Sequence, residues 1–475
     1  MHFYFRVDAN QLIGSGHYAR CLSLAKFLIK NKKNVTFITK SIEIKNQNNL
    51  YKKNIPTRIF HSNDMLKDIK NTLNIIKNKK NAYLIIDDYK FSAKWQRLVK
   101  KKIKNLILIN DYNSGLKDLI KINPSHFKSG FEKNILAAPL VDETYDNKNY
   151  LKNYKQLKNN YNIIISFGAS DKQNYTKKIC DIIDYKKFKK FNFKILIGKY
   201  YKYEKSLKQT DLYKKGRVSL IKNRNNLLHI FKRSRLAIVS GGVISRELIN
   251  LGIPAIILKI ADNQKFNINF YRKNKIFGIF EKKNLKKKKS SILNKLIIKK
   301  IDTSFNEYLN IISYSSTDVL NKTYYYITKS QVKKIFLRKT SIKDFIFLYS
   351  LVNQKKNRKY SFRKKRITID GHNKWFIERL VNDGSNMFIL EDQMGTRLGQ
   401  LRLELFKNKY YLDYSIDEFF QNKGLGRKMI NLLKTKQITN LPIYAKVLKD
   451  NIPSNKVFKN FTFDTYRDYN LFKIN

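Results

Sequence analysis

The sequence of 475 residues contains few cysteines and prolines and no long apolar run. Its two cysteines, Cys21 and Cys180, lie in apolar stretches where burial is the usual outcome, and they provide neither a disulfide framework nor the spacing of metal ligands. The opening segment MHFYFRVDAN lacks the plan of a signal peptide, and no stretch is apolar for long enough to span a membrane. We therefore expect a soluble cytoplasmic protein with no metal site and no membrane contact.

Acidic residues are also scarce, since 36 Asp and Glu stand against 98 Lys and Arg and leave a formal net charge of +62. Such an excess first suggests nucleic acid or an anionic membrane as a partner. The lysines, however, are dispersed along the chain, and glycine (17), proline (6) and tryptophan (2) are rare, which indicates a general compositional bias. A solvated basic surface that attracts anionic substrates such as nucleotide sugars is the favoured interpretation, and nucleic-acid binding is the alternative.

The pattern of short apolar runs predicts more than one domain, as the length of the chain requires. FYFRV, VTFITK, AYLIIDDY and NLILIND are typical of buried parallel strands, and HYARCLSLAKFLIK is typical of a helix. A second series begins at YNIIISFGASD and continues through FKILIG, VSLIK, RLAIVSGG and PAIILKI. We expect two Rossmann-like α/β lobes, residues 1–155 and 156–285, with a cleft between them.

The remaining sequence has a different character. Residues 286–332 are polar and helix-like, and we expect a closing helix and a linker there. From 333 to 475 the order is a strand, helices, meandering strands, a glycine loop with its helix, another strand and a terminal helix. This order predicts an α+β domain distinct from the two lobes.

The turn GSGH, residues 14–17, joins the first strand to its helix and allows three interpretations. Its glycines let the backbone approach a ligand, and the helix N-terminus that follows favours anions. The spacing differs from a dinucleotide-binding turn, because Ala19 stands at the position of the third glycine. The imidazole of His17 suits general-base catalysis. A phosphate-binding turn, a plain loop and a catalytic histidine all remain open on spacing alone.

The segment FRVDANQLIGSGHYARCLSLA resembles the start of the UDP-sugar hydrolases of pseudaminic acid biosynthesis, which remove UDP from 2,4-diacetamido-2,4,6-trideoxy-β-L-altropyranose. Further segments match in order as far as about residue 280: LIIDDY, IISFGASD and SGGVISRELINLGIPAIILKIADNQ. The matching positions in the first three segments are Arg6, Asp8, Ile13, Gly14, Gly16, His17, Arg20, Leu22, Leu24, Ala25, Asp87, Tyr89, Gly168 and Asp171.

This resemblance implies the two-lobe GT-B architecture of glycosyltransferases and a reaction without a metal. It implies that His17 activates water against the anomeric carbon, with inversion and release of UDP, and that Tyr89 and Asn263 face the sugar. The substrate-binding positions that it implies in the first lobe and at the start of the second are Gly14, Gly16, Arg20 and Asp171.

The second-lobe motif also has a physical basis. Ser240, Gly241 and Gly242 follow a strand and can present backbone N–H groups to a diphosphate. Glu247, one turn into the next helix, can accept both ribose hydroxyls; a surface glutamate is the alternative. Asn263 and Gln264 would close over the sugar, or form an ordinary polar loop.

One position departs from the family pattern. Asp142, in PLVDETY, stands where an arginine is expected before the second lobe. Loss of a cation near the nucleotide would weaken binding or mark a different sugar.

In the last domain, QNKGLGRKM is a Q-x-x-G-x-G loop that opens a helix, where consecutive N–H groups and the helix dipole bind a pyrophosphate. A glycine-containing turn is the alternative. The domain resembles the GNAT acetyltransferases, which implies acetyl-CoA as co-substrate. The implied acetyl-CoA-binding residues are Gln421, Lys423, Gly424, Leu425, Gly426, Arg427 and Asn451.

The segment SFRKKRITIDGHNKWF is similar to acetyltransferases that modify 4-amino nucleotide sugars, which implies His372 and Trp375 as substrate contacts; a core histidine is the alternative for His372. Two positions depart from the GNAT pattern. Phe458 stands where many relatives have a tyrosine acid, and Thr462 replaces a glycine. Tyr466 or water would then protonate the leaving thiolate, or the domain would be slow.

Together, the two resemblances imply a bifunctional enzyme of pseudaminic acid biosynthesis. It would acetylate the 4-amino group of a UDP-sugar and then remove UDP, with UDP-sugars and acetyl-CoA as its small-molecule partners. A hydrolase or glycosyltransferase for a related UDP-sugar, such as a legionaminic-type precursor, is one alternative. A basic nucleic-acid-binding protein is the other.

Overall fold

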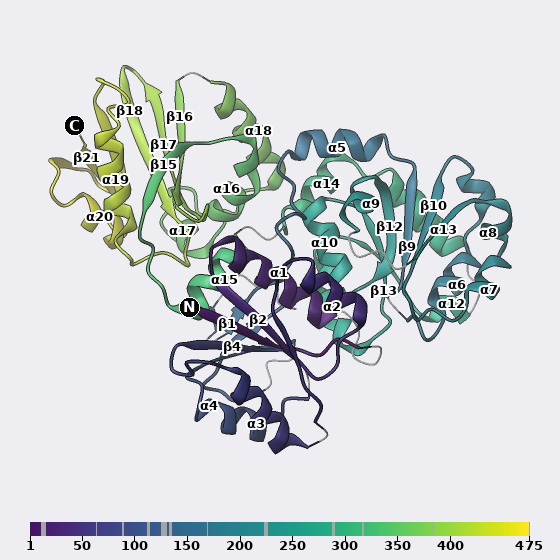
Figure 1. Cartoon of the computed structure of the whole chain (residues 1–475). Coiled ribbons are helices and arrows are strands. Elements are labelled where there is room, and N and C mark those ends of the chain that lie inside the picture. The colour runs from purple at the N-terminus through teal and green to yellow at the C-terminus, as the bar shows by residue number, and fades with distance from the viewer. Residues whose placement is uncertain are drawn as a thin grey trace. The chain divides into compact units, whose positions relative to one another are not determined.

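The structure, a computed structural model, divides into two compact units (Figure 1). Unit 1 contains Met1–Asn147 and Leu151–Lys329, and unit 2 contains Lys148–Tyr150 and Ser330–Asn475. The structure describes residues 1–475 except 11–15, 63, 88–89, 112–114, 125–130, 133–134, 169, 223–226, 287–289, 316–317, 383 and 475.

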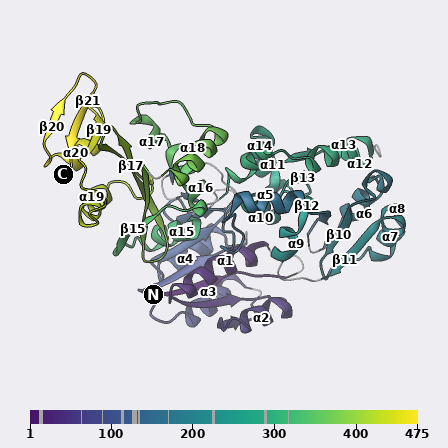
Figure 2. The same cartoon turned by 90° about the horizontal axis from the view of Figure 1, so that it is seen from above.

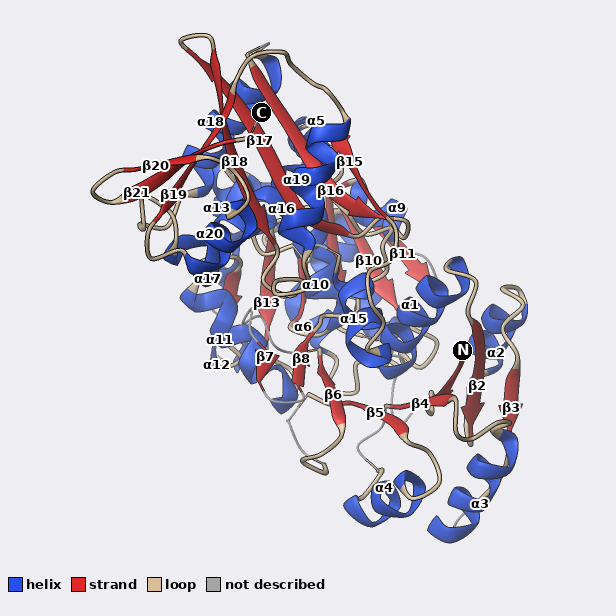
Figure 3. Cartoon of the chain, turned by 90° about the vertical axis from the view of Figure 1, so that its left-hand side faces the viewer, coloured by secondary structure: helices blue, strands red, loops and turns tan. Residues whose placement is uncertain are grey.

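The first lobe of unit 1 is built on a sheet whose strand order is β3-β2-β1-β4-β5-β6-β8-β7 (Figure 3). The pairs from β3 to β8 are parallel, and β7 pairs with β8 antiparallel. Helices cover the sheet, so its strands are near-continuous apolar runs, and Phe3 and Phe5 are wholly buried. The elements are β1 (His2–Arg6), α1 (Gly16–Lys30), β2 (Asn34–Thr39), α2 (Ile44–Tyr51), β3 (Thr57–Ile59), α3 (Met65–Ile75), β4 (Ala82–Ile86), α4 (Ala93–Lys100), β5 (Asn105–Ile109), β6 (Ile120–Asn123), β7 (Phe131–Glu132) and β8 (Ile135–Ala137).

The second lobe has a parallel sheet of order β11-β10-β9-β12-β13-β14. Its central strand β9 places Ile163 and Ile165 in one core cluster and Ile164 in the other, so the sheet is buried on both faces. Figure 2 shows α6, α7 and α8 gathered beside β10 and β11. The elements are α5 (Tyr150–Lys158), β9 (Asn162–Ser166), α6 (Tyr175–Cys180), η1 (Tyr185–Phe188), β10 (Asn192–Ile197), α7 (Glu204–Lys208), α8 (Asp211–Lys215), β11 (Arg217–Lys222), α9 (Leu228–Lys232), β12 (Ser234–Ser240), α10 (Val243–Leu251), β13 (Ala255–Leu258), η2 (Asp262–Gln264), α11 (Lys265–Lys273) and β14 (Gly278–Phe280).

The segment expected to hold a closing helix and a linker contains α12 (Lys283–Lys286), α13 (Ser290–Ile301), α14 (Phe305–Ile312) and α15 (Val319–Thr328). Leu293 and Ile297 of α13 belong to the core of the second lobe. In contrast, α15 packs on α1 of the first lobe, where the Lys33 ammonium lies 5.7 Å from the ring centre of Tyr324. The chain therefore returns to the first lobe at the end of unit 1.

Unit 2 has a mixed sheet of order β15-β16-β17-β18-β19-β21-β20. Neighbouring strands of this sheet are antiparallel, except that β18 is parallel to β19. These two strands pair only where Tyr410–Leu412 lies beside Ile443–Ala445. Beyond these residues the two strands lose their mutual pairing. The elements are β15 (Ile335–Lys339), η3 (Ile342–Asp344), α16 (Phe345–Val352), α17 (Lys355–Lys359), α18 (Ile369–Val381), β16 (Ser385–Asp392), β17 (Arg397–Phe406), β18 (Lys409–Ile416), α19 (Leu425–Thr435), β19 (Ile443–Leu448), α20 (Ile452–Phe458), β20 (Phe463–Thr465) and β21 (Tyr469–Lys473).

The predicted fold class is confirmed in its class and in its order: two Rossmann-like α/β lobes followed by an α+β domain. One expected element is wrong, because the chain does not end in a helix. The helix α20 is followed by the antiparallel strands β20 and β21. Phe472 of β21 is buried against Phe458 and Phe463, and this packing holds the hairpin on the domain.

Candidate active site

His17 lies in the first turn of α1, beside the residue that follows β4. Its Nδ1 atom lies 2.6 Å from Oδ1 of Asp87. The backbone N–H of Asp87 donates to the carbonyl of Arg6 at the end of β1, at 3.1 Å. Because β1 and β4 are parallel neighbours, the segments that leave them meet at the same edge of the sheet, where α/β proteins bind ligands.

Arg20 binds the same carboxylate from the next turn of α1. Its Nε and Nη2 atoms each donate to Asp87 at 2.6 Å, and its Nη1 donates to Asp111 at 3.0 Å. Residues three apart share a helix face, so His17 and Arg20 reach one aspartate. Burial raises the pKa of Asp87, but the attraction of Arg20 and His17 outweighs it and holds that pKa below its usual value. Asp87 is therefore an ionised carboxylate at neutral pH.

The proton of His17 Nδ1 can be assigned from its neighbours. Nδ1 lies 2.6 Å from Asp87 Oδ1 and 3.1 Å from Arg20 Nη2. A guanidinium only donates and an ionised carboxylate only accepts, so the shorter contact assigns the proton to the bond with Asp87. Nε2 is then the ring nitrogen that can accept a proton. The sequence pointed to His17, whereas this partnership with Asp87 depends on the pairing of β1 with β4.

One cavity of about 220 Å³ brings residues of both lobes together. From the first lobe it is lined by Gly16, His17, Arg20, Asp111, Pro124, Leu140 and Val141, and from the second by Gly241, Gly242, Val243, Arg246, Gln264 and Asn267. The sequence analysis gave no role to seven of these residues: Asp111, Pro124, Leu140, Val141, Val243, Arg246 and Asn267. The only local signal for Arg246 was its place beside Glu247 in the SGGVISRE motif.

The second-lobe wall of the cavity is the N-terminus of α10, whose N-cap is Gly242. A Cβ atom on Gly241 would lie 3.1 Å from Ile268 Cγ1, tighter than ordinary contact, so a glycine suits this turn. Asn267 Nδ2 donates to the carbonyl of Gly241 at 2.9 Å. Gln264 lines the cavity, and its Oε1 accepts the backbone N–H of Ile260 at 3.1 Å. The N-terminus of α10 therefore lines the cavity, and helix N-termini favour anions.

Glu247 is half-buried one turn into α10. Burial and then the negative charge of Asp142 raise the pKa of Glu247 to about 8. Asp142 itself accepts from Lys26 Nζ of α1 at 2.5 Å and from Thr144 N at 3.0 Å. Asp142, which replaces the expected arginine, thus adds negative charge beside Glu247 and pairs with a lysine of the first lobe.

The remaining predicted residues of unit 1 have different placements. Asp171 is buried, has a φ of 38°, and accepts the backbone N–H groups of Tyr175 and Thr176 at 2.8 and 2.7 Å. It holds the first two N–H groups of α6, whose N-cap is Asn174, and the described residues that line the cavity do not include it. Ser240 ends β12 immediately before the glycines. Gly14, Tyr89 and the side chain of Asn263 lie outside the described residues.

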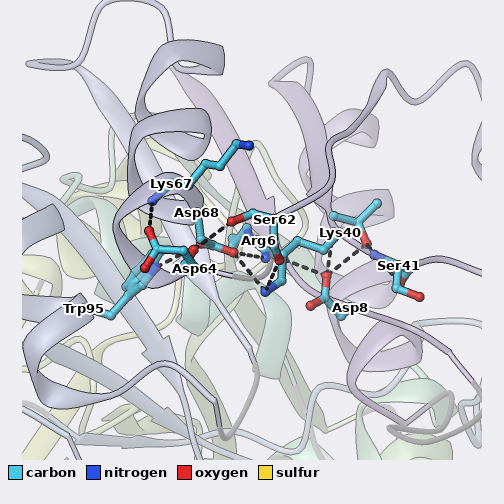
Figure 4. Close-up of polar contacts among 10 residues, drawn as sticks. Arg6, Asp8, Lys40, Ser41, Ser62, Asp64, Lys67, Asp68 and Trp95 are labelled. Carbon is cyan, nitrogen blue, oxygen red and sulfur yellow. Dashed lines mark hydrogen bonds and ion pairs between the residues drawn. The ribbon is translucent and has the colours of Figure 1, made fainter.

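Figure 4 shows a buried polar network around Arg6, at the carboxyl ends of β1 and β2. Arg6 is wholly buried, and its Nη1 and Nη2 donate to Asp8 at 2.7 Å and to Asp68 at 2.8 Å. Asp8 also accepts the backbone N–H of Lys40 at 2.8 Å, and Asp68 accepts Trp95 Nε1 at 2.9 Å. The matched positions Arg6 and Asp8 therefore fix the exit of β1, from which the chain continues to His17.

In unit 2, the predicted acetyl-CoA loop lies between β18 and α19. Gly424 is the N-cap of α19 with a φ of +71°, a conformation that favours glycine. No described heavy atom lies within 4 Å of the position its Cβ would take. A Cβ on Gly426 would lie 3.2 Å from Val457 and 3.3 Å from Tyr414, so α19 approaches α20 closely here. Leu425 is the first residue of α19 and is buried.

The other residues predicted to bind acetyl-CoA mostly support this loop. Gln421 Nε2 donates to Asn357 Oδ1 at 3.0 Å and to the carbonyl of Ile416 at 3.1 Å, which ties the loop to α17 and β18. Asn451 caps α20 by accepting the backbone N–H of Ser454. The Lys423 ammonium lies over the rings of Phe419 and Phe420, and Arg427 donates to the carbonyl of Lys456.

Of the predicted acceptor-side residues of unit 2, His372 and Trp375 lie together with ring centres 5.3 Å apart, whereas Tyr466 lies in the terminal hairpin. His372 is 2% exposed, and burial lowers its pKa to about 4. Its ring lies among those of Phe345, Tyr349, Trp375 and Phe376, which favours the alternative of a core histidine. Trp375 also carries the Arg402 guanidinium 5.0 Å from its ring centre. Tyr466 is 44% exposed and stacks on Tyr469 in the terminal hairpin.

No family model matches the sequence. The chain is similar to an uncharacterized protein of Methanocaldococcus jannaschii, with 24% identity over 483 residues, 96% of this chain and 95% of that protein. It is also similar to the crystal structure of MurG from Acinetobacter baumannii, with a TM-score of 0.51 and 13% identity over 69% of this chain and 99% of that one. The spermidine N-acetyltransferase of Vibrio cholerae, solved with CoA and spermine, has a TM-score of 0.27 and 19% identity over 29% of this chain and 92% of that one.

The first unit shares its fold with MurG. The two Rossmann-like lobes of unit 1 thus have the GT-B arrangement that the sequence predicted. Among the described residues, no group of three or more His, Cys, Asp or Glu could hold a metal ion. In the same part of the chain, every helix is too short or too polar to cross a bilayer.

Proposed function

We propose that unit 1 removes UDP from a nucleotide sugar and that unit 2 acetylates the amino-sugar precursor of that substrate. The observation that carries the first activity is the single cavity lined both by His17, paired with Asp87, and by the N-terminus of α10. A base at one side of a substrate and anion-stabilising donors at the other suit displacement at a sugar phosphate.

In the proposed reaction, Nε2 of His17 takes a proton from water as the water oxygen bonds to the anomeric carbon. The bond between that carbon and the β-phosphate oxygen breaks, its electron pair stays on the phosphate oxygen, and the anomeric centre is inverted. Asp87 accepts a hydrogen bond from the Nδ1–H group of His17 at 2.6 Å. This bond holds the ring in one tautomer and stabilises the imidazolium that forms. Arg20 and Asp111 fix the carboxylate in turn.

The substrate we propose is the UDP-2,4-diacetamido-2,4,6-trideoxy-β-L-altropyranose of pseudaminic acid biosynthesis, on the strength of the matched motifs. Its diphosphate would bind the N–H groups at Gly241 and Gly242, and its ribose would bind Glu247. The sugar would contact Gln264, Asn263 and Tyr89, and Gly16 would leave room for it.

For unit 2, we propose that acetyl-CoA binds where β18 and β19 cease to pair, with its pyrophosphate on the loop around Gly424 and Gly426. The amine of the 4-amino UDP-sugar would attack the thioester, and the thiolate would leave. The product of unit 2 is then the substrate of unit 1.

The direct test of the hydrolase is incubation of the full chain with the diacetamido UDP-sugar, with release of UDP and anomeric configuration followed by NMR. We expect UDP and the inverted free sugar. His17→Ala should reduce the rate at least about 10³-fold, because the general base is lost. His61→Ala, at an exposed histidine of the same lobe, is the matched control and should leave the rate unchanged. A wild-type rate in His17→Ala would show that another group is the base.

A glycosyltransferase is the second candidate, favoured by the fold shared with MurG. It predicts that UDP is released only when an acceptor sugar or lipid is added, whereas the hydrolase needs none. The acetyl-transfer step is tested separately by mass spectrometry of the 4-amino UDP-sugar after incubation with acetyl-CoA. An unmodified amine would refute the second activity without affecting the first.

A further inference from the structure

Arg246 is a second arginine in the cavity of unit 1, and the proposed reaction has so far given it no role. It lies in the second turn of α10, just beyond the N-terminus of the helix at Gly242. Its side chain lines the cavity together with His17 and Arg20, although it is only 8% exposed. A positive charge is therefore built into the wall that carries the helix N-terminus.

The guanidinium of Arg246 is held by hydrogen bonds from the second lobe. Nη2 donates to Asn267 Oδ1 at 3.0 Å, and Asn267 Nδ2 donates to the carbonyl of Gly241 at 2.9 Å. The hydroxyl of Tyr271 also bonds to Arg246, and it lies 2.8 Å from Ser245 Oγ. Asn267 thus couples the guanidinium to the glycine turn, so the cation and the backbone donors of α10 keep a fixed relation.

The hydrogen bonds of the two arginines of the cavity include different kinds of acceptor. Arg20 binds two carboxylates, Asp87 and Asp111, so its positive charge is already compensated. Arg246 donates to the neutral amide oxygen of Asn267. Burial lowers the pKa of Arg246 by more than the attraction of Tyr271 and Asp111 raises it. An anion placed beside this buried cation would be bound strongly, since charge-assisted hydrogen bonds gain strength away from water.

We propose that Arg246 binds the diphosphate of the nucleotide sugar and neutralises the charge that develops on it when the glycosidic bond breaks. This inference rests on the proposed hydrolysis. As the water oxygen bonds to the anomeric carbon and its proton passes to His17, the electron pair of the broken bond goes to the β-phosphate oxygen. The leaving UDP then carries one more negative charge than it did in the substrate. Arg246 and the N–H groups of α10 stabilise the negative charge on UDP, while His17 holds the proton.

The test compares UDP with uridine, which lacks the diphosphate, in binding to the full chain. We expect Arg246→Met to weaken UDP binding at least about 10-fold and to lower kcat/KM for the UDP-sugar by about 10²–10³-fold, with uridine binding unchanged. Arg246→Lys should recover part of both losses, because it restores the charge without the planar fork. Arg272→Met is the matched control, since it removes a partly exposed arginine of the same lobe that does not line the cavity.

The outcomes separate this inference from the proposed function. If the wild-type chain released UDP from the sugar and Arg246→Met matched its rate within twofold, the role of Arg246 would be wrong and the hydrolase would stand. If the wild type failed to hydrolyse the sugar but bound UDP through Arg246, the hydrolase would be wrong and diphosphate recognition would stand. Equal losses of UDP and uridine binding in Arg246→Met would mean that the side chain only supports the fold, and would overturn the inference.

Discussion

Asp87 joins three neighbours of α1 at a single carboxylate. It accepts from His17 Nδ1 and from two nitrogens of Arg20, and the thiol of Cys21 lies 3.4 Å from its Oδ2. A wholly buried carboxylate held by this many donors stays ionised and keeps one orientation. The orientation of the His17 ring is therefore set by a residue that lies 70 positions away in the sequence.

Asp87→Asn should reduce kcat for UDP release by about 10³–10⁴-fold while leaving UDP affinity unchanged. The amide presents an N–H group as well as an oxygen, so it no longer holds the Nδ1 proton of His17 in one tautomer. Steady-state kinetics of UDP release give the rate, and calorimetry gives the affinity. The unchanged UDP affinity serves as the internal control for the folding of unit 1. A rate within threefold of the wild type would contradict the role assigned to Asp87.

We expect Glu247 to make the binding of UDP dependent on pH. Its pKa is raised to about 8 by burial and by Asp142, and only the ionised carboxylate accepts two ribose hydroxyls. The affinity for UDP should therefore rise as the pH increases through about 8. Asp142→Asn removes the repulsion and should move the midpoint to lower pH, whereas Asp118→Asn, at an exposed carboxylate, should not. Calorimetric titration with UDP across this pH range is the measurement, and a flat profile would contradict the role of Glu247.

The raised pKa of Glu247 also contributes to the free energy of unfolding, and this contribution falls as the pH rises, whereas the affinity for UDP should increase. In the folded chain Glu247 keeps its proton up to a pH of about 8, whereas the unfolded chain loses it near the ordinary value of 4.5. Between these values the unfolded chain binds fewer protons, so the contribution of Glu247 to the free energy of unfolding decreases as the pH rises. Binding of a ribose would offset this cost.

At the scale of elements, both proposed anion sites lie at helix N-termini that begin with glycine, at α10 and at α19. The two glycines serve different geometric needs. Gly242 has a φ of −91°, which other residues also adopt, so its value lies in leaving the first N–H groups of α10 uncovered. Gly424 has a φ of +71°, so a side chain there is strained before any ligand is considered.

Gly424→Val should abolish measurable acetyl-CoA binding, because the side chain would project into the space proposed for the pyrophosphate. Gly395→Val is the matched control. Gly395 has a φ of +74°, and like Gly424 it has no described heavy atom within 4 Å of its Cβ position. Both variants should lose a similar stability, about 1–3 kcal/mol from backbone strain. Denaturant unfolding and acetyl-CoA titration distinguish the cases, and loss of binding in both variants would make strain the cause.

At the scale of the whole molecule, the charge of +62 is a property of composition, while the buried ion pairs are a property of the fold. Arginines bind four of the buried carboxylates, Asp8, Asp68, Asp87 and Asp344. The lysines are dispersed along the chain and give the surface its positive field. The field attracts anions of any kind, so it does not by itself distinguish a nucleotide sugar from a nucleic acid.

The dependence on salt distinguishes long-range electrostatic attraction of the substrate from its binding in the cavity. Raising the ionic strength from about 0.05 to 0.5 M should lower kcat/KM for the UDP-sugar severalfold, because long-range attraction is screened, and should leave kcat nearly unchanged. Hydrolysis rates at saturating and at low substrate give the two constants. A fall in kcat of the same size would mean that salt acts on the site itself. Tight DNA binding with a steep salt dependence would instead favour the nucleic-acid alternative.

The local pattern of apolar and polar residues predicted most of the long strands. Several strands of unit 1 that are built on a run of apolar residues, such as β1, β4, β9 and β12, were predicted because parallel strands buried on both faces carry little polar sequence. Short strands such as β3 and β14 were missed, since three residues give no readable period. The terminal hairpin was missed for a similar reason, because β20 has three residues, all of them exposed, and only Phe472 of β21 is buried.

The sequence by itself determined the fold class, the glycine turns before α10 and α19, and His17 as the histidine to test. The partners of those residues were decided by the tertiary structure: Asp87 beside His17, Asn267 between Arg246 and the glycine turn, and Asp142 beside Glu247. The physical reason is the distance along the chain between the residues that interact. A turn or a helix depends on neighbours within a few positions, whereas the charge and orientation of a buried side chain depend on strands and helices that the chain reaches tens of residues later.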